Sequence, residues 1–204
     1  MSDIDEILTF WFEGLNDRKL LDKNAPAVKK WFVKNEHFDR EIRQQFEENL
    51  LKAVRGEYAP WKNSASGRLA LVILFDQFSR NMYRGSPKMF AADGAALAVS
   101  LRSIEDGFDG KLQLIERIFL YMPLMHAEDL RVQELALKYF GRLVAESKEK
   151  SPKNTAYYEY SFSFARQHHE IIKEFGRFPH RNNILGRVST PQESEFLKRP
   201  GSSF

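Results

Sequence analysis

One stretch of the sequence decides the fold: Leu69-Ala-Leu-Val-Ile-Leu-Phe-Asp-Gln-Phe-Ser-Arg-Asn-Met-Tyr-Arg-Gly85. Its first seven residues are apolar, a pattern that fits either a buried strand or a helix that is apolar on every side. The context favours a helix, because Ser64 and Ser66 offer N-caps and apolar residues recur as far as Met82. A helix without a polar face must be enclosed by other helices. The stretch therefore predicts a central, buried helix.

The last turns of this predicted helix carry polar side chains. Buried polar groups are unfavourable unless each is hydrogen bonded or paired. We therefore expect the central helix to deliver a polar cluster into the interior, where side chains from other helices meet it. The residues concerned are Asp76, Gln77, Arg80 and Asn81.

Helical patterns cover most of the remaining chain, and no segment shows the two-residue alternation of a half-buried strand. We therefore predict an all-α fold of about eight to ten helices, paired as antiparallel hairpins in one domain of residues 1–204. We expect a helix break or kink at Pro123, a polar connector at residues 147–155, and an irregular C-terminal wrap over the bundle at residues 176–204. Other helices are predicted at about residues 3–12, 26–32, 35–56, 87–105, 111–122, 127–145, 156–175 and 191–197.

The composition is that of a globular protein, with 43% hydrophobic and 29% charged residues among 204. The absence of cysteine excludes disulfides, thiolate nucleophiles and cysteine-ligated metals. The sequence lacks both a signal-peptide pattern at its start and an apolar run of membrane-spanning length. We therefore expect a soluble, cytoplasmic protein without a membrane partner.

The net charge of +3 arises in residues 151–204, which hold 8 basic and 5 acidic residues. Within them, residues 175–192 contain three arginines and a histidine but no acid. This positive segment is too short, and too mixed with phenylalanine and proline, for a nucleic-acid groove. We therefore expect no nucleic-acid partner.

Four phrases of the sequence resemble a known bacterial family, the domain-of-unknown-function family numbered nine hundred and twenty-four. The resemblance extends from Phe10-Trp-Phe12 to the end of the chain. It implies a tetratricopeptide-like right-handed superhelix of helical hairpins and no established activity. Related folds bind partners on concave surfaces, but this link is an analogy between folds. The phrases are Phe75-Asp-Gln-Phe-Ser-Arg-Asn81, Met122-Pro-Leu-Met-His-Ala-Glu-Asp129, Phe175-Gly-Arg-Phe-Pro-His-Arg-Asn182, and Leu185-Gly-Arg187 followed by Ser189-Thr190.

Histidines supply the first candidates for chemistry. On a helix, His126, Asp129 and Gln133 would share one face, so that His126 and Asp129 could form an acid/base pair or two metal ligands. Alternatively, they cap and brace the helix that begins after Pro123. His168 is predicted to point inward, either as a hydrogen-bonded core residue or with His126 and His180 in a three-histidine site. Because these three lack metal-type spacing, we predict neither a metal nor another cofactor.

Arginines form the second group of candidates. Gly176 and Pro179 prevent a continuous helix, so Arg177 and Arg181 should lie on an irregular loop. The planar fork of arginine binds carboxylates and phosphates in a bidentate manner. In one hypothesis, both arginines, with Arg187, join Arg80 around an anionic small molecule or an acidic peptide end. In the other, they pair with Asp76, Asp129 and Glu128 as internal braces.

Three functions remain open from the sequence. The leading hypothesis is a cleft that binds an anionic small molecule or a peptide terminus. The second is a hydrolase-type enzyme that uses His126 or His180 as general base, with Asp129 as its orienting partner. The third is a structural or protein-interaction module in which the polar cluster is an internal brace. The proposed ligand-binding residues are Asp76, Arg80, His126, Asp129, His168, Arg177, His180 and Arg181.

Overall fold

The structure is a computed structural model that describes residues 2–203, and every regular element in that range is helical. The predicted all-α fold is thereby confirmed. The α-helices are α1 (Asp3–Phe12), α2 (Pro26–Lys29), α3 (Glu36–Val54), α4 (Ala65–Val72), α5 (Ser79–Met82), α6 (Asp93–Glu105), α7 (Leu114–His126), α8 (Leu130–Lys150), α9 (Thr155–Phe175) and α10 (Pro191–Phe196). Short 3₁₀ turns include η1 (Ala59–Asn63), η3 (Pro87–Phe90) and η6 (Pro179–Arg181).

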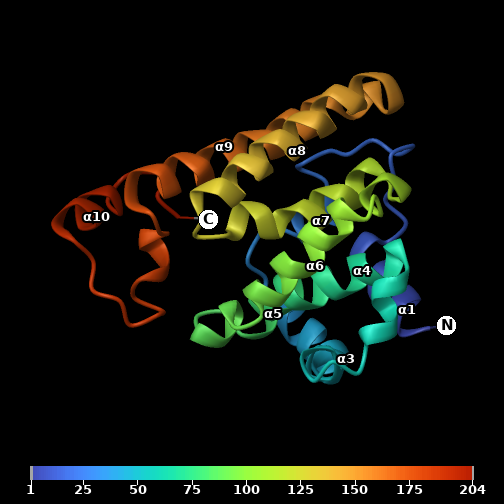
Figure 1. Cartoon of the computed structure of the whole chain (residues 1–204), viewed down its shortest axis with the longest axis horizontal. Helices are drawn as coiled ribbons and strands as arrows, with labels where there is room; N and C mark the ends of the chain where they lie inside the picture. Colours follow the sequence, from blue (N-terminus) through green and yellow to red (C-terminus); the bar gives the residue numbers. More distant parts are fainter. Residues whose placement is uncertain (1, 204) are drawn as a thin grey trace.

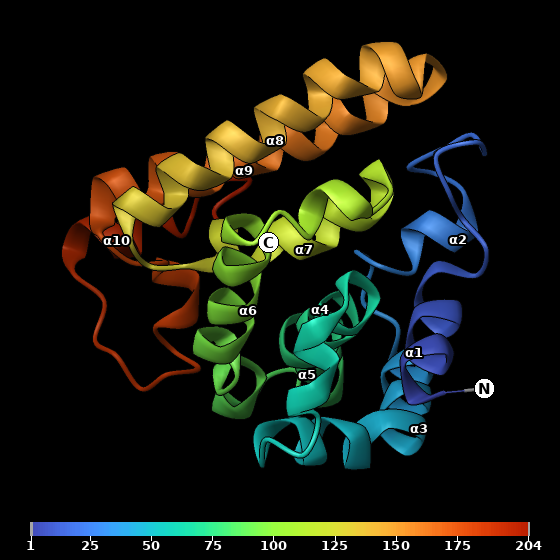
Figure 2. The same ribbon diagram turned by 45° about the vertical axis from the view of Figure 1, so that its right-hand side comes forward.

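The helices are arranged around α4 and α7. The long helices α8 and α9 form an antiparallel hairpin that lies along α7 (Figures 1 and 2). On its other side, α7 packs against α4 and α6, and α3 packs against α5. The segment of residues 176–203 lies at the end of the hairpin where α8 begins and α9 ends (Figure 1). This end of the hairpin therefore lies near the junction of α7 and α8.

The predicted central helix is a continuous helical stretch in three parts. After α4 comes a π-helical segment, Ile73–Phe78, and then α5. Ser64 caps the stretch, as expected, because its hydroxyl accepts a hydrogen bond from the Gly67 amide. All six residues of the π-helical segment are buried. π-Helical turns inside α-helices are rare and often occur at functional sites. The position of this segment therefore makes the polar cluster a candidate functional site.

Aromatic side chains fill the core around this stretch. Trp11 packs edge-to-face against Phe78 and Phe119, with ring centroids 5.5 Å apart in both pairs. Trp31 completes the group by donating from its indole nitrogen to the Trp11 carbonyl at 2.9 Å. Such pairs stabilise a core by more than their buried area alone. A smaller apolar group, of Ile171, Ile172 and Phe178 with Phe175 and Phe196, attaches the C-terminal segment to α9.

Three predicted helix boundaries were wrong. The break expected at Pro123 does not occur, since α7 continues to His126. A single proline removes one backbone hydrogen bond, and the burial of α7 on nearly all sides offsets that loss. The start predicted for the connector at residues 147–155 is too early, because Ser147 is buried and α8 continues to Lys150. The helix predicted from Pro87 is interrupted, with a 3₁₀ turn before α6 starts at Asp93.

Candidate functional site

Asp76 lies at the centre of a buried group of polar side chains. Its carboxylate is fully buried in the π-helical segment. Oδ1 lies 3.0 Å from Arg80 Nη1 and 2.7 Å from His126 Nδ1, at the end of α7. Oδ2 accepts a hydrogen bond from Gln77 Nε2 at 2.5 Å. Every oxygen of this buried carboxylate therefore has a partner.

A second carboxylate, that of Asp93, links Arg80 to the C-terminal segment. Arg80 donates from Nη1 to Oδ1 at 2.9 Å and from Nη2 to Oδ2 at 3.0 Å. Arg181 Nη1 lies 3.5 Å from the same Oδ2, and Arg181 Nη2 donates to the His126 carbonyl at 3.0 Å. We call Asp76, Arg80, Asp93, His126 and Arg181 the Asp76 network. It joins the central helix, α6, α7 and η6.

The protonation states of the network follow from burial and neighbouring charges. Burial alone would raise the pKa of Asp76, but the Arg80 guanidinium and His126 outweigh it and hold that pKa below its usual range. Burial lowers the pKa of His126, although Asp76 partly opposes the shift. At neutral pH, Asp76 is therefore ionised and His126 is neutral. Because an ionised carboxylate only accepts hydrogen bonds, His126 carries its proton on Nδ1.

His168 and His180 lie beside the network as neutral imidazoles. As predicted, His168 points inward, and its Nδ1 lies 2.9 Å from the Phe164 carbonyl. Its ring centroid is 5.9 Å from that of His126. Burial lowers the pKa of His168 to about 3, and burial with the nearby Arg181 lowers the pKa of His180 to about 4. Residues 2–203 contain no group of three histidine or acidic side chains placed to hold a metal ion.

The acid/base alternative requires Asp129 to lie against His126, and the structure does not pair the two residues. Asp129 is the N-cap of α8, and its Oδ1 accepts a hydrogen bond from the Val132 amide at 3.1 Å. The helical spacing assumed for the two residues is absent, because α7 ends at His126 and α8 begins at Leu130. The capping alternative therefore holds for Asp129, whereas His126 is the last residue of α7. The carboxylate that orients His126 is instead Asp76, 50 residues earlier in the chain.

Arg177 does not contact Arg80, so this part of the arginine hypothesis was also wrong. Its Nε and Nη2 lie 2.6 Å and 2.7 Å from the two carboxylate oxygens of Glu193. Arg187 forms a similar fork with Glu128, at 2.7 Å and 2.9 Å, as the brace hypothesis expects for that carboxylate. Asp93 and Glu193 were not found from the sequence, because no local spacing links them to their arginines.

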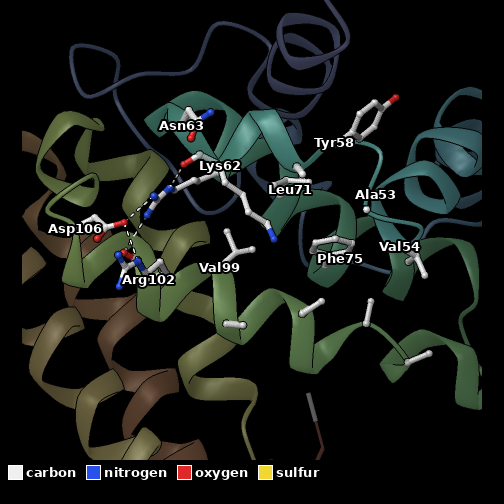
Figure 3. Close-up of a pocket in the computed structure, with 17 residues that line it drawn as sticks. Ala53, Val54, Tyr58, Lys62, Asn63, Leu71, Phe75, Val99, Arg102 and Asp106 are labelled. Atoms are coloured by element: carbon white, nitrogen blue, oxygen red, sulfur yellow. Dashed lines mark hydrogen bonds and ion pairs between the residues drawn. The ribbon is translucent and has the colours of Figure 1, made fainter.

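A groove lies beside the central helix and shares none of its lining residues with the network. It has a volume of about 650 Å³ and lies between the end of α3, η1, α4 and α6 (Figure 3). Small residues of α6 are the one local feature of the sequence in this region, and small residues normally allow another helix to approach closely. In the structure Ala95 and Ala98 are exposed and line the groove instead. Its lining is Ala53, Val54, Gly56, Tyr58, Ala59, Lys62, Asn63, Arg68, Leu71, Phe75, Ala91, Ala92, Ala95, Ala98, Val99, Arg102 and Asp106. We call it the α4–α6 groove.

Comparison with known proteins places the chain in a family without an assigned role. The model of a family described as a bacterial protein of unknown function (DUF924) matches residues 7–201. A solved structure of the protein of unknown function ATU0120 from Agrobacterium tumefaciens is 32% identical, covers 96% of each chain and superposes with a TM-score of 0.78. No curated protein matches the sequence. In the described part of the chain, no helix is both long and apolar enough to cross a membrane. The chain belongs to the DUF924 family of bacterial proteins of unknown function.

Proposed function

We propose that the protein is a helical binding module and that the Asp76 network is its internal brace. The observation that carries this proposal is the charge balance of the network. The carboxylates of Asp76 and Asp93 match the guanidiniums of Arg80 and Arg181, while His126 is neutral. A ligand carboxylate placed there would leave one negative charge uncompensated in a buried position, which is unfavourable.

The position of the network supports the role of a brace. Arg80 belongs to the central helix, Asp93 begins α6, His126 ends α7 and Arg181 lies in the C-terminal segment. Four parts of the chain that are remote in sequence thus depend on one another's charges. Removing one partner of a buried ion pair typically costs about 3–5 kcal/mol, even where the intact pair adds little net stability. The network therefore fixes how these four parts of the chain pack against one another.

The anion-binding hypothesis has less support from the geometry. It requires arginines with unsatisfied charge, whereas Arg177 and Arg187 are held in forks by Glu193 and Glu128. Arg181 is nearly buried and also stacks on the rings of Phe90 and Phe178, 4.7 Å and 4.4 Å from their centroids. An anionic small molecule or acidic peptide end would have to displace one of these carboxylates.

Thermal unfolding distinguishes the brace from an anion site. The test compares Arg181→Ala with Arg131→Ala, a control at an exposed arginine of α8 that has no ion pair within residues 2–203. For a brace, Arg181→Ala lowers the Tm by about 6 °C or more, the equivalent of at least about 2–3 kcal/mol for a chain of this length. Phosphate, acetate and a short acidic peptide then raise the Tm of the parent no more than that of either variant. Saturable stabilisation of the parent that Arg181→Ala abolishes would replace the brace with an anion site.

General-base catalysis is a second candidate function, because one specific contact favours it. The carboxylate of Asp76 orients the His126 ring through Nδ1 at 2.7 Å, which leaves the lone pair on Nε2. No residue between 2 and 203 hydrogen bonds to Nε2, and the His126 side chain is 16% exposed. An imidazole held in this way can accept a proton from water during ester or phosphate hydrolysis. The orienting carboxylate in this candidate is Asp76, in place of the predicted Asp129.

The test of this candidate is turnover of ester and phosphate substrates. His126→Gln should abolish any activity found, whereas Asp129→Asn, which preserves the helix cap, should leave it intact. Activity that survives His126→Gln unchanged excludes His126 as the base. The pH–rate profile should then show no dependence on this imidazole.

A further inference from the structure

We propose that the α4–α6 groove binds a single-chain amphiphile, a molecule with an extended apolar tail and one anionic head group, and that Lys62 is the counter-ion of the head group. The inference deepens the proposed function, on which it rests, because it names the surface and the ligand class of the binding module. It uses none of the charges of the Asp76 network.

The lining of the groove suits an apolar tail. Leu71, Phe75 and Val99 are buried residues of the central helix and α6 whose side chains border the groove (Figure 3). At its edge, Val54 is 62% exposed, an unusual position for a valine at the end of a long helix. The volume of about 650 Å³ lies within the range of about 300–1,000 Å³ that is typical of small-molecule sites. The groove thus offers an apolar surface of ligand size.

Small residues on α6 keep the groove open. Ala95 and Ala98 are one turn apart on α6 and so lie on one face of it, while Ala91 lines the groove just before the helix begins. All three are exposed in the structure. Longer side chains at these positions would occupy the space between α6 and η1. The groove therefore depends on the absence of side-chain volume along this face.

The cations at one end of the groove are neutralised, except for Lys62. Arg68 is buried and pairs with Asp106 at 2.7 Å, while Arg102 pairs with both Glu105 and Asp106, at 2.8 Å and 3.1 Å. Lys62 has no ion-pair partner among the described residues. Figure 3 shows its side chain extending into the groove toward Leu71 and Val99. One unpaired ammonium beside an apolar surface is complementary to a ligand with one negative charge.

The backbone of Lys62 is held firmly in place. Arg68 donates from Nε to the Lys62 carbonyl at 2.5 Å and from Nη1 to the Arg102 carbonyl at 3.0 Å. In addition, η1 packs directly on α4 at Gly67, where a Cβ atom would lie 2.2 Å from the Trp61 carbonyl oxygen. The fixed backbone limits the positions open to the ammonium group. The base of the Lys62 side chain is therefore fixed beside the groove, and its flexible stem lets the ammonium reach a head group there.

The apolar lining also decides between ligand classes. Polyanions such as nucleotides need several cations or backbone amides, whereas this groove presents one unpaired cation. A neutral apolar molecule would gain nothing from Lys62. A fatty-acid-like carboxylate satisfies both the apolar wall and the single charge, and it is the occupant to which the geometry points.

The experiment is isothermal titration calorimetry with three probes that share one tail, namely decanoate, decanol and decyltrimethylammonium, each below its micelle-forming concentration. Decanoate should bind most tightly, decanol more weakly, and the cation most weakly. Lys62→Gln should weaken decanoate binding by about threefold to fivefold, the effect of one exposed ion pair, and leave decanol unchanged. Lys62→Glu should make the cation the preferred probe. Lys148→Gln, at an exposed lysine of α8, is the matched control.

Two further variants test where the tail lies. Ala95→Leu and Ala98→Leu should each abolish binding of all three probes, while Ala145→Leu, at an exposed alanine of α8, should not. Thermal unfolding confirms that each variant is folded. Equal binding of the three probes together with an unchanged Lys62→Gln variant would overturn the role of Lys62. Absence of binding, or binding that persists in both groove variants, would overturn the site itself.

The test of the groove and the test of the brace can fail independently of each other. Arg181→Ala protein, measured below its Tm, should bind decanoate as the parent does. If phosphate or an acidic peptide proves to bind at Arg181 while decanoate still depends on Lys62, the brace fails and the groove stands. If the network behaves as a brace and decanoate does not bind, the brace stands and the groove proposal fails.

Discussion

Arg80 and Asp93 form a fork-to-fork ion pair, with Nη1–Oδ1 and Nη2–Oδ2 distances of 2.9 Å and 3.0 Å. The pair joins α5 to the first residue of α6, the helix whose alanines line the groove. Arg181 contacts the same carboxylate from the C-terminal segment. Asp93 is thus shared by two cations, and the position of α6 depends on it.

Asp93→Asn should therefore be among the most destabilising isosteric changes in the protein. The amide leaves two largely buried guanidiniums without a full counter-charge. The expected loss of unfolding free energy is about 3 kcal/mol, at the lower end for a buried pair because the Asp93 side chain is 25% exposed. Urea denaturation measures it, with Glu134→Gln at an exposed position of α8 as control. A loss below about 1 kcal/mol would mean that solvent screens this pair as it does a surface one.

Asp76→Asn should change the titration of His126. In the parent protein the carboxylate raises the pKa of His126 against the larger, opposite effect of burial. Removing the charge while keeping a hydrogen-bond acceptor should lower that pKa further, since burial is then less opposed. Nitrogen-15 NMR of the folded variant reports both this pKa and the ring tautomer. An increase in the pKa of His126 would show that Asp76 is not its dominant charged neighbour.

Acidification should destabilise the protein before the ion-paired carboxylates of Glu146 and Glu193 titrate. The pKa of His168 falls from 6.5 to about 3 on folding because of burial. Below pH 6.5 the unfolded chain takes up a proton on this imidazole and the folded chain does not, so unfolding free energy falls with pH by up to about 1.4 kcal/mol per pH unit. The carboxylates of Glu146 and Glu193, with pKa values of about 2, lose their stabilising charge only below pH 4.5.

The range between pH 6.5 and pH 4.5 therefore separates the histidine contribution from that of Glu146 and Glu193. His168→Asn retains an amide that can donate to the Phe164 carbonyl, and it should flatten the dependence of stability on pH in this range. His37→Asn, at an exposed residue of α3, should not. Equal slopes for parent and His168→Asn would show that His168 titrates normally in the folded protein.

Asp129 should behave as a helix cap and not as a partner of His126. Asp129→Ala should lower the unfolding free energy by about 1 kcal/mol, because the Val132 amide at the start of α8 loses its acceptor. Asp129→Ser should restore most of the loss, since serine caps helices as well as aspartate does. Chemical denaturation measures both changes. A serine variant as unstable as the alanine variant would indicate that the charge of Asp129 has another role.

Substitution by alanine should lower the stability of the protein at Gly67 and raise it at Gly94. A Cβ atom at Gly67 would collide with the Trp61 carbonyl, so Gly67→Ala should destabilise the contact between η1 and α4 by more than about 1 kcal/mol. Gly94 lies in the first turn of α6 with open space around its Cβ position, and Gly94→Ala should stabilise by about 0.5–1 kcal/mol. Thermal unfolding of the pair provides the comparison. A stabilising Gly67→Ala would show that the packing of η1 adapts.

Local signals in the sequence predicted the helices well where caps and apolar spacing agreed. Ser2, Asn35 and Thr190 cap α1, α3 and α10, and these helices begin within one residue of the predicted starts. The prediction of a helix break at Pro123 failed because the signal for a break is local, whereas the burial that stabilises α7 comes from neighbouring helices. The π-helical segment had no recognisable signal, since its residues are equally compatible with a regular α-helix.

The candidate site was predicted in part. Asp76, Arg80, His126 and Arg181 do meet, because a helix buried on all sides brings its polar groups to whatever partners surround it. Their pairing with Asp93 could not be read from one sequence, since ion pairs between distant helices leave no local spacing. The groove was missed for a related reason. The alanines of α6 indicate close packing or empty space equally well, and only the arrangement of η1 and α3 distinguishes the two.

The π-helical segment from Ile73 to Phe78 has a consequence for insertions and deletions. Loss of one residue there would leave the hydrophobicity of the stretch almost unchanged and allow an unbroken α-helix. Each residue of an α-helix advances the chain by about 100°, so every side chain from Ser79 onward would turn by roughly that angle. Arg80 would then face away from both carboxylates while all apolar positions downstream lost their register. The number of residues in this segment thus sets the orientation of α5 about its axis. Members of the family should therefore keep the length of the segment even where its residues vary.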